Sequence, residues 1–283
     1  MAFDGAFLHT VINELNTAAG SFVEKIYQPS REELIIHLKS KGFSGKLLIV
    51  ARSGSGRVGL TLSKFENPQT PPMFCMLLRK IFLPSRFVGA EQKGLERIIE
   101  LKFEATNEMG DRVYPKIICE FMSGSTNIII ADENNKIIDA VNRSDITAAR
   151  LIMPGAEYQY PDNRGKQDIL SKTPDEVVNI VKQSGGEVSA ALLNNFEGLS
   201  PLVCRELCFS AFGSVDINPD ICDYNKLKKP IENLQKKIKG EPQFTVLYHD
   251  GTPKDFSFTD INQYGNTYNK KYFTSAEKNP ADS

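Results

Sequence analysis

Residues 98–141 read IIELKFEATNEMGDRVYPKIICEFMSGSTNIIIADENNKIIDAV, and this stretch decides the fold. It holds short apolar runs rich in isoleucine, valine and phenylalanine, separated by segments of Asn, Asp, Glu and Gly. Runs of this kind between turn-forming residues are typical of neighbouring strands joined by hairpins. The stretch therefore predicts a β-meander with strands at Ile98 to Phe103, Val113 to Phe121, Asn127 to Ala131 and Ile137 to Val141.

The residues before the meander predict further strands and two helices. Residues 4–19 have apolar side chains at helical spacing, with Asp4 available as N-cap and Gly20 as a stop. Prolines within residues 68–72 disfavour a strand and favour the first turn of a helix that runs to about Phe82. Three short strands are predicted at Phe22 to Tyr27, Leu34 to Leu38 and Leu47 to Ala51.

The second half of the chain is predicted to be mainly helical. Thr173-Pro174-Asp175-Glu176 combines a cap, a first-position proline and first-turn acids, which together mark a helix start. The Pro/Gly/Tyr-rich segment before it has no periodicity and is expected to link two domains. Further helices are predicted at 187–196, 200–212 and 230–240, followed by a hairpin of Phe244 to Tyr248 with Phe256 to Ile261.

The pattern as a whole predicts an α+β protein with successive parts. The β-rich domain is expected at residues 1–152 and the linker at 153–172. The helical domain is expected at 173–240, and residues 241–283 hold the hairpin and the chain beyond it. A length of 283 residues also favours two domains over one.

The composition is that of a globular protein that stays in the cytoplasm. Hydrophobic residues make up 41% and charged residues 24%, and no segment approaches the roughly 18 apolar residues that span a bilayer. An acid at Asp4 argues against a secretory signal. Five scattered cysteines indicate reduced thiols without a disulfide or a metal site: Cys75, Cys119, Cys204, Cys208 and Cys222.

The net charge of −1 is unevenly distributed along the chain. Residues 1–100 hold 13 Lys and Arg against 9 Asp and Glu, a formal charge of +4. The remainder holds 21 against 26, a formal charge of −5. This asymmetry is compatible with a phosphate-binding face in the first hundred residues, although a mild imbalance is also ordinary for a solvated surface.

The sequence carries no recognisable catalytic or cofactor-binding motif. The three histidines, His9, His37 and His249, have no nucleophile or metal ligand at motif spacing. No nucleophile elbow, H-E-x-x-H or G-x-G-x-x-G motif at a strand-to-helix turn is present. We therefore expect a protein that is not an enzyme and that needs no metal or cofactor.

A glycine-rich segment, RSGSGR at residues 52–57, is a first candidate for contact with a nucleic acid. Arg52 and Arg57 flank its glycines, so the loop has the composition of a phosphate-binding turn. It lacks the Lys-Ser/Thr ending of a nucleotide P-loop. A flexible connection between strands explains the same residues.

Two further segments suit a nucleic acid. At residues 196–201, Gly198 permits a tight turn and Ser200 precedes a helix whose free N–H groups can receive a backbone phosphate. Any helical hairpin has the same features. Glu96 and Arg97 are an adjacent acid and base at the entry to the meander, and such a couple is ordinarily a surface pair of little energetic value.

Several segments taken together indicate a family. They are MAFDG (1–5), ENP (66–68), PPMFCMLLRK (71–80), NEMGD (107–111), TNII (126–129) and MPG (153–155). In this combination the chain closely resembles the N-terminal region of the NFACT family, some of whose members carry the older name fibronectin-binding protein A. The resemblance extends over nearly the whole chain, through the turn at Gly198.

The resemblance implies a fold and a function. The expected fold is a β-rich domain similar to the N-terminal domain of formamidopyrimidine DNA glycosylases, followed by a helix-hairpin-helix domain. Family members bind the large ribosomal subunit that carries a stalled chain on peptidyl-tRNA, recruit tRNA, and in bacteria support untemplated C-terminal alanine tailing. The implied partners are tRNA, with alanine tRNA expected, and the obstructed large subunit. Because members continue into a coiled coil, the chain is expected to be a fragment.

The resemblance also implies site residues. The family's essential Asp-Arg pair maps onto Glu96 and Arg97, where Glu replaces Asp. The family also usually has a basic residue and a histidine before Ser-Asn, where this chain has residues 123–127, and a histidine where it has Ile81. The full set of expected tRNA contacts is Glu96, Arg97, Arg79, Lys80, Arg52 and Arg57, with Gly198 and Ser200 as backbone-phosphate contacts.

Two other functions remain open from sequence. A surface adhesin that binds fibronectin or fibrinogen is suggested by the older family name, but it requires export. An enzyme that processes nucleic acid is suggested by the glycosylase-like fold. That chemistry resembles a Schiff-base mechanism from an N-terminal proline, whereas processing here would expose Ala2.

Overall fold

The computed structural model describes residues 3–122, 124–144 and 147–274, and the chain divides into two compact units. The helical unit contains the residues up to Thr10, the short segment Gly94–Glu96, and the residues from Asp162 onward. The sheet unit contains Val11–Lys93 and Arg97–Pro161. The expected domain boundaries at residues 152, 172 and 240 stay a prediction. Met1, Ala2 and Ser123 of the quoted segments, and residues 275–283 of the expected tail, lie outside the described residues.

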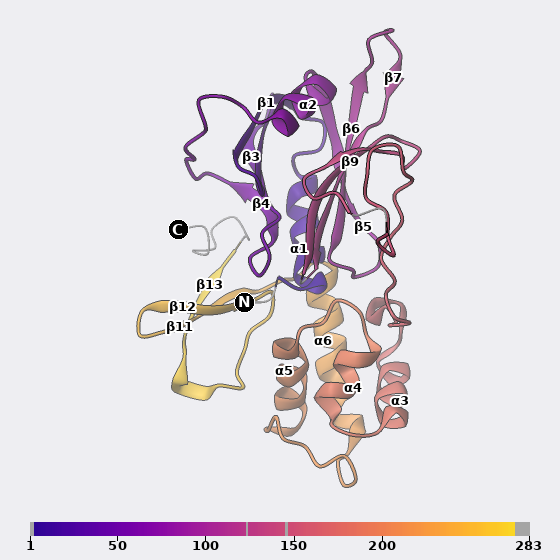
Figure 1. The fold of residues 1–283 in the computed structure, drawn as a ribbon. Coiled ribbons are helices and arrows are strands. Elements are labelled where there is room, and N and C mark those ends of the chain that lie inside the picture. The colour runs from indigo at the N-terminus through magenta and orange to yellow at the C-terminus, as the bar shows by residue number, and fades with distance from the viewer. Residues whose placement is uncertain (1–2, 123, 145–146, 275–283) are drawn as a thin grey trace. The chain divides into compact units, whose positions relative to one another are not determined.

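The sheet unit is organised around one large antiparallel sheet (Figure 1). Its strand order is β10-β9-β8-β6-β5-β1-β2-β3-β4, with β7 paired to β6. The helix α2 (Met73–Phe82) belongs to this unit, and α1 (Gly5–Asn16) contributes its residues from Val11 onward. The strands are β1 Phe22–Ser30, β2 Glu33–Ser40, β3 Phe43–Val50, β4 Arg57–Thr61, β5 Ser85–Gln92, β6 Ile98–Thr106, β7 Arg112–Val113, β8 Lys116–Met122, β9 Ser125–Ala131 and β10 Ile137–Ala140.

The predicted meander is confirmed as strands β6, β8, β9 and β10. Most residues of β6, β8 and β9 are buried, because side chains on both faces of these strands are covered. Continuous apolar runs such as Ile128 to Ala131 are what a strand buried on both faces requires. One hydrophobic cluster joins Ile98, Ile118, Ile129, Ala131 and Ile137 across four neighbouring strands.

In the sheet unit, β4 and β5 occur where the sequence predicted no strand, as does β13 in the helical unit. In β5 the buried positions include Ser85 and Ala90, whereas Val88 is exposed, so hydrophobicity does not alternate with the pleat. The strand is also irregular at Gly89, where its register against β6 shifts. β4 is only five residues long and includes a glycine, which weakens the strand pattern.

The stretch 153–172, expected to be a linker, is packed against its surroundings. Tyr158 donates a hydrogen bond to Glu120 at 2.8 Å, and Tyr160 donates one to Glu100. Arg150 binds both carboxylate oxygens of Glu120 at 2.6 Å. Burial and the Glu120 charge raise the pKa of Tyr158, so its hydroxyl stays protonated and available as a donor. Tyrosine is amphipathic, and this explains how an aperiodic segment can nevertheless be fixed on a sheet.

The helical unit combines four helices and a three-stranded sheet (Figure 1). The predicted helix start at Thr173 is confirmed: its hydroxyl accepts from the Glu176 N–H at 3.3 Å, and the Glu176 carboxylate accepts from the Thr173 N–H at 2.7 Å. The sheet order is β12-β11-β13. The elements are α3 Pro174–Ser184, α4 Val188–Asn195, α5 Pro201–Phe212, α6 Lys228–Lys239, β11 Phe244–His249, β12 Thr252–Ser257 and β13 Asn269–Phe273, with short 3₁₀ turns at Ile169–Ser171, Tyr224–Leu227 and Gly265–Thr267.

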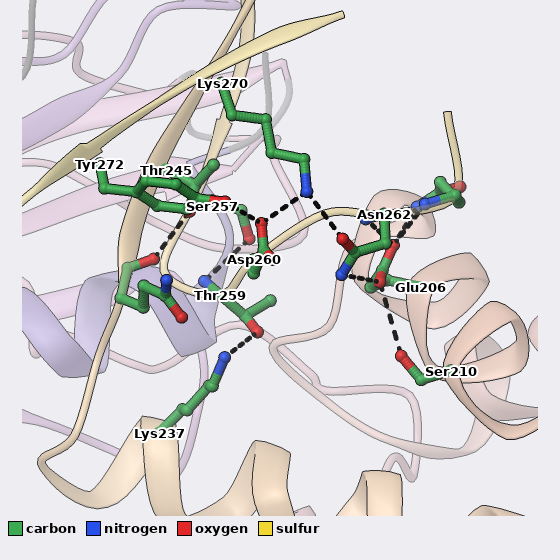
Figure 2. A network of polar contacts seen from close by, with 12 residues as sticks. Glu206, Ser210, Lys237, Thr245, Ser257, Thr259, Asp260, Asn262, Lys270 and Tyr272 are labelled. Atoms are coloured by element: carbon green, nitrogen blue, oxygen red, sulfur yellow. Dashed lines mark hydrogen bonds and ion pairs between the residues drawn. The ribbon is translucent and has the colours of Figure 1, made fainter. Parts of the chain in front are cut away.

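A polar network holds the connection between β12 and β13 (Figure 2). The buried carboxylate of Glu206 on α5 accepts from the backbone N–H groups of Asn262 at 2.8 Å and Gln263 at 3.0 Å. Asp260 accepts from Lys270 at 2.9 Å, and Lys237 donates to Thr259 at 2.9 Å. These bonds fix an irregular connection on the helices. Within the described ranges, no helix is long and apolar enough to cross a membrane.

The Glu120 network provides a test of what stabilises the sheet unit. The Glu120 side chain is only 1% exposed, so Arg150→Ala leaves a buried carboxylate without its charge partner. We expect the free energy of unfolding to fall by about 3 kcal/mol in urea denaturation. Arg143→Ala is the matched control, because the exposed Arg143 pairs with Asp139 on the surface. It is expected to change little, and equal effects of the two variants would refute the assignment.

Candidate functional site

Glu96 and Arg97 lie in the short segment that connects β5 and β6. Leu95 before them is fully buried, whereas Glu96 and Arg97 are both half-buried. The division between the compact units falls between the two residues, with Glu96 in the helical unit and Arg97 in the sheet unit. Each is therefore described with its own unit.

Within the helical unit, Glu96 follows a segment that is held unusually tightly. Glu197, whose side chain is buried, accepts a hydrogen bond from the Leu95 N–H at 3.0 Å. The Gly198 carbonyl accepts from the Ala6 N–H at 2.9 Å. We call this arrangement of residues 4–6, 94–96 and 197–198 the glycine clamp.

The glycines of the clamp allow backbones to approach more closely than side chains permit. A Cβ on Gly5 would lie 1.6 Å from the Leu95 carbonyl oxygen, and one on Gly198 would lie 2.4 Å from the Leu95 Cβ. A Cβ on Gly94 would likewise lie 2.1 Å from a carboxylate oxygen of Glu197. The sequence indicated the MAFDG segment and the turn that contains Glu197 and Gly198, but not the part that Leu95 plays. The available signal was the position of glycines in the MAFDG segment and in the 196–201 turn.

Within the sheet unit, Arg97 is held by its backbone and leaves its side chain uncommitted. Its carbonyl oxygen accepts from the Phe121 N–H at 2.9 Å. Across the described part of the chain, the Arg97 guanidinium makes no hydrogen bond, ion pair or ring contact. A half-buried arginine in that state retains its full charge and its planar donors for a ligand.

Within the sheet unit, the glycine-rich loop 52–57 and Arg97 both contact Phe121. Gly56 packs on Phe121, and a Cβ there would lie 3.1 Å from the ring. Phe121 therefore touches the loop with its side chain and Arg97 with its backbone. Arg52, at the start of the loop, forms ion pairs with Glu32 at 3.4 Å and Glu33 at 3.3 Å, so its charge is largely balanced.

Arg79 and Lys80 on α2 are engaged inside the sheet unit. Arg79 donates to the carbonyl oxygen of Ile26 at 2.9 Å and lies over the Tyr27 ring at 5.6 Å. This geometry ties α2 to β1 and gives Arg79 a structural role. Lys80 forms an exposed ion pair with Glu108 at 3.0 Å.

Gly198 and Ser200 also have internal partners. Ser200 is buried, and its hydroxyl accepts from the Val203 N–H at 3.4 Å, which caps α5. Gly198 is part of the glycine clamp. Contact of these two residues with a phosphate stays a prediction, because the structure shows what they do within the chain.

Other reactive groups in the described residues do not assemble into a centre. Burial raises the pKa of the Cys119 and Cys204 thiols and brings that of Cys208 to about 12, so these thiols stay protonated. Among the residues described, no three His, Cys, Asp or Glu side chains gather as metal ligands. A groove of about 670 Å³ lies between α5, α6 and the segment near Asp260, where Lys237 bonds Thr259 and Asp260 accepts from Lys270 (Figure 2), and we assign it no ligand.

The close approach of Gly198 to Leu95 is testable with a matched pair of substitutions. Gly198 and Gly213 have φ of +74° and +76°, but only a Cβ at Gly198 meets another residue. Both changes to alanine should cost about 1 kcal/mol in left-handed strain, and Gly198→Ala should lose about 1 to 3 kcal/mol more by overpacking. Thermal and urea unfolding measure the difference. Equal losses for Gly198→Ala and Gly213→Ala would contradict the clamp.

Comparison with known proteins shows the same architecture elsewhere. The family model of the NFACT N-terminal and middle domains matches residues 4–279. The crystal structure of the fibrinogen binding protein from Staphylococcus aureus superposes with a TM-score of 0.83 at 27% identity, covering 97% of this chain and 96% of that one.

Curated relatives extend the comparison in sequence. The protein named Rqc2 homolog RqcH from Bacillus subtilis is 35% identical over 210 residues, which is 73% of this chain and 37% of that protein. The homolog of the same name from Streptococcus suis is 30% identical over 300 residues, which is 99% of this chain and 53% of its own length. The human ribosome quality control complex subunit NEMF is 25% identical over 247 residues, which is 84% of this chain and 22% of that protein. The chain thus spans about half or less of these relatives, and it belongs to the NFACT family as an N-terminal region.

Proposed function

We propose that this chain is a tRNA-binding and ribosome-binding module of cytoplasmic ribosome quality control. The support is the family membership together with the names of relatives, which include a ribosome quality control complex subunit. Its partners are tRNA and the large ribosomal subunit that carries an obstructed chain. In this proposal the module contributes binding, and the longer protein uses it during untemplated alanine tailing with alanine tRNA.

The observation that carries the proposal is the uncommitted guanidinium of Arg97. Four of the basic side chains expected to contact tRNA belong to residues that have an interaction within the chain: Arg52, Arg79, Lys80 and Arg57. Among the basic residues of that set, Arg97 alone has a side chain without an interaction in the described part of the chain. A cation that the fold leaves unused, next to a loop packed on Phe121, suits a phosphate or a base edge.

Glu96 has a positioning role in this proposal. The glycine clamp fixes the backbone immediately before it, so its carboxylate emerges from a rigid support. Glutamate keeps the charge of the family's aspartate but is one methylene longer. The proposal therefore expects Glu96→Asp to bind tRNA at least as well as the natural chain.

The proposal requires no bond-making chemistry from this chain. A tRNA-positioning factor presents the aminoacyl-tRNA, and the ribosome itself forms the peptide bond. We propose that the chain is not an enzyme, that the sheet unit is similar in fold to the N-terminal domain of formamidopyrimidine DNA glycosylases, and that α3, α4 and α5 supply a helix-hairpin-helix. The hairpin turn is then the Glu197–Gly198 turn, whose buried geometry supports the clamp.

tRNA binding by the isolated chain tests the proposal directly. Arg97→Ala is expected to weaken binding about tenfold or more, because charge-assisted bonds of arginine are each worth roughly 1.5 to 3 kcal/mol. Binding of labelled tRNA is measured by gel shift and by fluorescence anisotropy at several salt concentrations. Arg112→Ala is the control, since this exposed arginine on β7 is paired with Glu104.

Two results would count against the function. The first is a natural chain that binds no tRNA at low salt. The second is an Arg97→Ala variant that binds as tightly as Arg112→Ala. Circular dichroism of each variant shows whether the fold is retained, so a loss of binding can be separated from unfolding.

A second candidate function follows from the structural comparison. The Staphylococcus aureus neighbour is named a fibrinogen binding protein, and it aligns over 97% of this chain. Binding of immobilised fibrinogen by the natural chain, unaffected by Arg97→Ala and accompanied by no tRNA binding, would favour an adhesin instead.

A further inference from the structure

A row of basic and aromatic side chains crosses four neighbouring strands of the sheet unit. Phe22 on β1 lies opposite Arg86 on β5 and opposite Lys39 on β2. The next outward row pairs Lys25 with His37, and His37 with Lys46 on β3. A bulge between Val23 and Lys25 keeps Phe22 and Lys25 on one face of the sheet.

Around Phe22 this face is exposed, whereas further along the same strands it carries a buried cluster of Ile35, Leu48 and Val50 against which Tyr27 packs. The alternate residues Val23, Ile26, Ile36 and Leu38 are buried on the opposite face. Phe22 is 52% exposed, whereas a phenylalanine side chain is ordinarily buried in a folded protein. We call Phe22, Lys25, His37, Lys39, Lys46 and Arg86 the Phe22 strip.

The charge of the Phe22 strip is strongly positive. Four of its members are Lys or Arg. Two of them have internal partners, since Lys39 is paired with Glu24 at 3.1 Å and Lys46 donates to the Ser63 carbonyl oxygen at 2.8 Å. Neither the Lys25 nor the Arg86 side chain has an ion pair or hydrogen bond to any residue that the structure describes. Glu104, the cross-strand neighbour of Arg86, is itself paired with Arg112.

The strip also carries planar side-chain groups. The Arg86 guanidinium lies over the Phe22 ring at 5.1 Å, which orients a planar cation on an exposed aromatic side chain. The rings of His37 and Tyr27 lie 5.3 Å apart on the same face. Burial and the nearby Lys46 and Lys25 lower the pKa of His37, which favours a neutral ring between the two lysines.

We propose that the Phe22 strip binds single-stranded RNA, with a base stacked against Phe22 and Arg86 and with an adjacent phosphate at Lys25. This inference rests on the proposed RNA-binding function and adds a second contact surface, separate in sequence from Glu96 and Arg97. Unpaired bases stack on aromatic rings and on guanidinium planes, while lysines track the backbone. Strands spaced roughly 4.8 Å apart place such groups side by side on a sheet.

The strip suits RNA better than a lipid surface. A peripheral membrane site needs several apolar side chains that enter the interface together. Here a single ring is exposed and is already covered on one side by a cation. Alternation of cations with planar groups matches the alternation of phosphates and bases.

The experiment measures binding of a labelled, unpaired RNA oligonucleotide about 12 nucleotides long, within the site sizes of single-strand-binding folds. Phe22→Ala is expected to weaken binding about tenfold without changing its salt dependence, and Phe22→Tyr is expected to restore it. Lys25→Gln is expected to lower the slope of log affinity against log salt by about 0.7. Met109→Ala and Lys254→Gln are matched controls, since Met109 is 89% exposed and Lys254 is an exposed lysine on β12.

The outcomes separate this inference from the proposed function. If Phe22→Ala and Met109→Ala bind the oligonucleotide alike while Arg97→Ala still loses tRNA, the strip is rejected and the function stands. If the natural chain binds neither RNA, both are rejected. Phe22-dependent binding to phosphatidylserine vesicles in place of the oligonucleotide overturns the strip as an RNA site. Loss with Phe22→Ala and rescue by Phe22→Tyr, whatever Arg97→Ala does, supports it.

Discussion

The close backbone approach around Leu95 is the constraint on which the candidate site depends. Three segments far apart in sequence meet there only because Gly5, Gly94 and Gly198 carry no Cβ. The buried Glu197 carboxylate also fixes the orientation of the Leu95 backbone, since it accepts a hydrogen bond from the Leu95 N–H at 3.0 Å. A buried carboxylate is costly unless it is hydrogen-bonded, and so the bond and the close packing require each other. The backbone before Glu96 is therefore positioned by these steric limits, by the Glu197 hydrogen bond and by the burial of Leu95.

The same principle recurs at other irregular segments. Glu120 holds residues 150–158 through Arg150 and Tyr158, and Glu206 holds the connection after β12 through backbone N–H groups. In each case a buried acid on a regular element supplies the acceptors that a loop cannot supply for itself. Loops satisfied in this way resist fraying, because opening them would leave the acid unpaired. Aperiodic sequence is thus compatible with a fixed conformation, as the packed 153–172 stretch shows.

Sequence was sufficient where one physical signal dominated. The isoleucine-rich runs of β6, β8 and β9, and the cap at Thr173, were predicted because burial on both faces and helix capping each leave a local pattern. β5 was missed because its pleat buries Ser85 and exposes Val88. At the site, the resemblance indicated Glu96 and Arg97, but the roles of Leu95, Glu197 and Phe121 depend on contacts over long sequence separations. No local pattern encodes which glycine faces which carbonyl oxygen, and so these partners required the structure.

Contacts within the fold distinguish basic residues that are free to bind a ligand from those that are already engaged, a distinction that the sequence alone does not make. Arg52 is balanced by Glu32 and Glu33, and Arg79 is committed to β1, so each would have to give up internal contacts in order to bind RNA. The side chains of Arg97 and Lys25 give up none among the described residues, and each therefore offers a ligand its charge with only hydration to replace. Counterion release favours RNA binding most at cations without an internal carboxylate partner, because no carboxylate has to be displaced when the phosphate binds. The uneven charge of the first hundred residues therefore matters less than which of its cations the fold leaves unpaired.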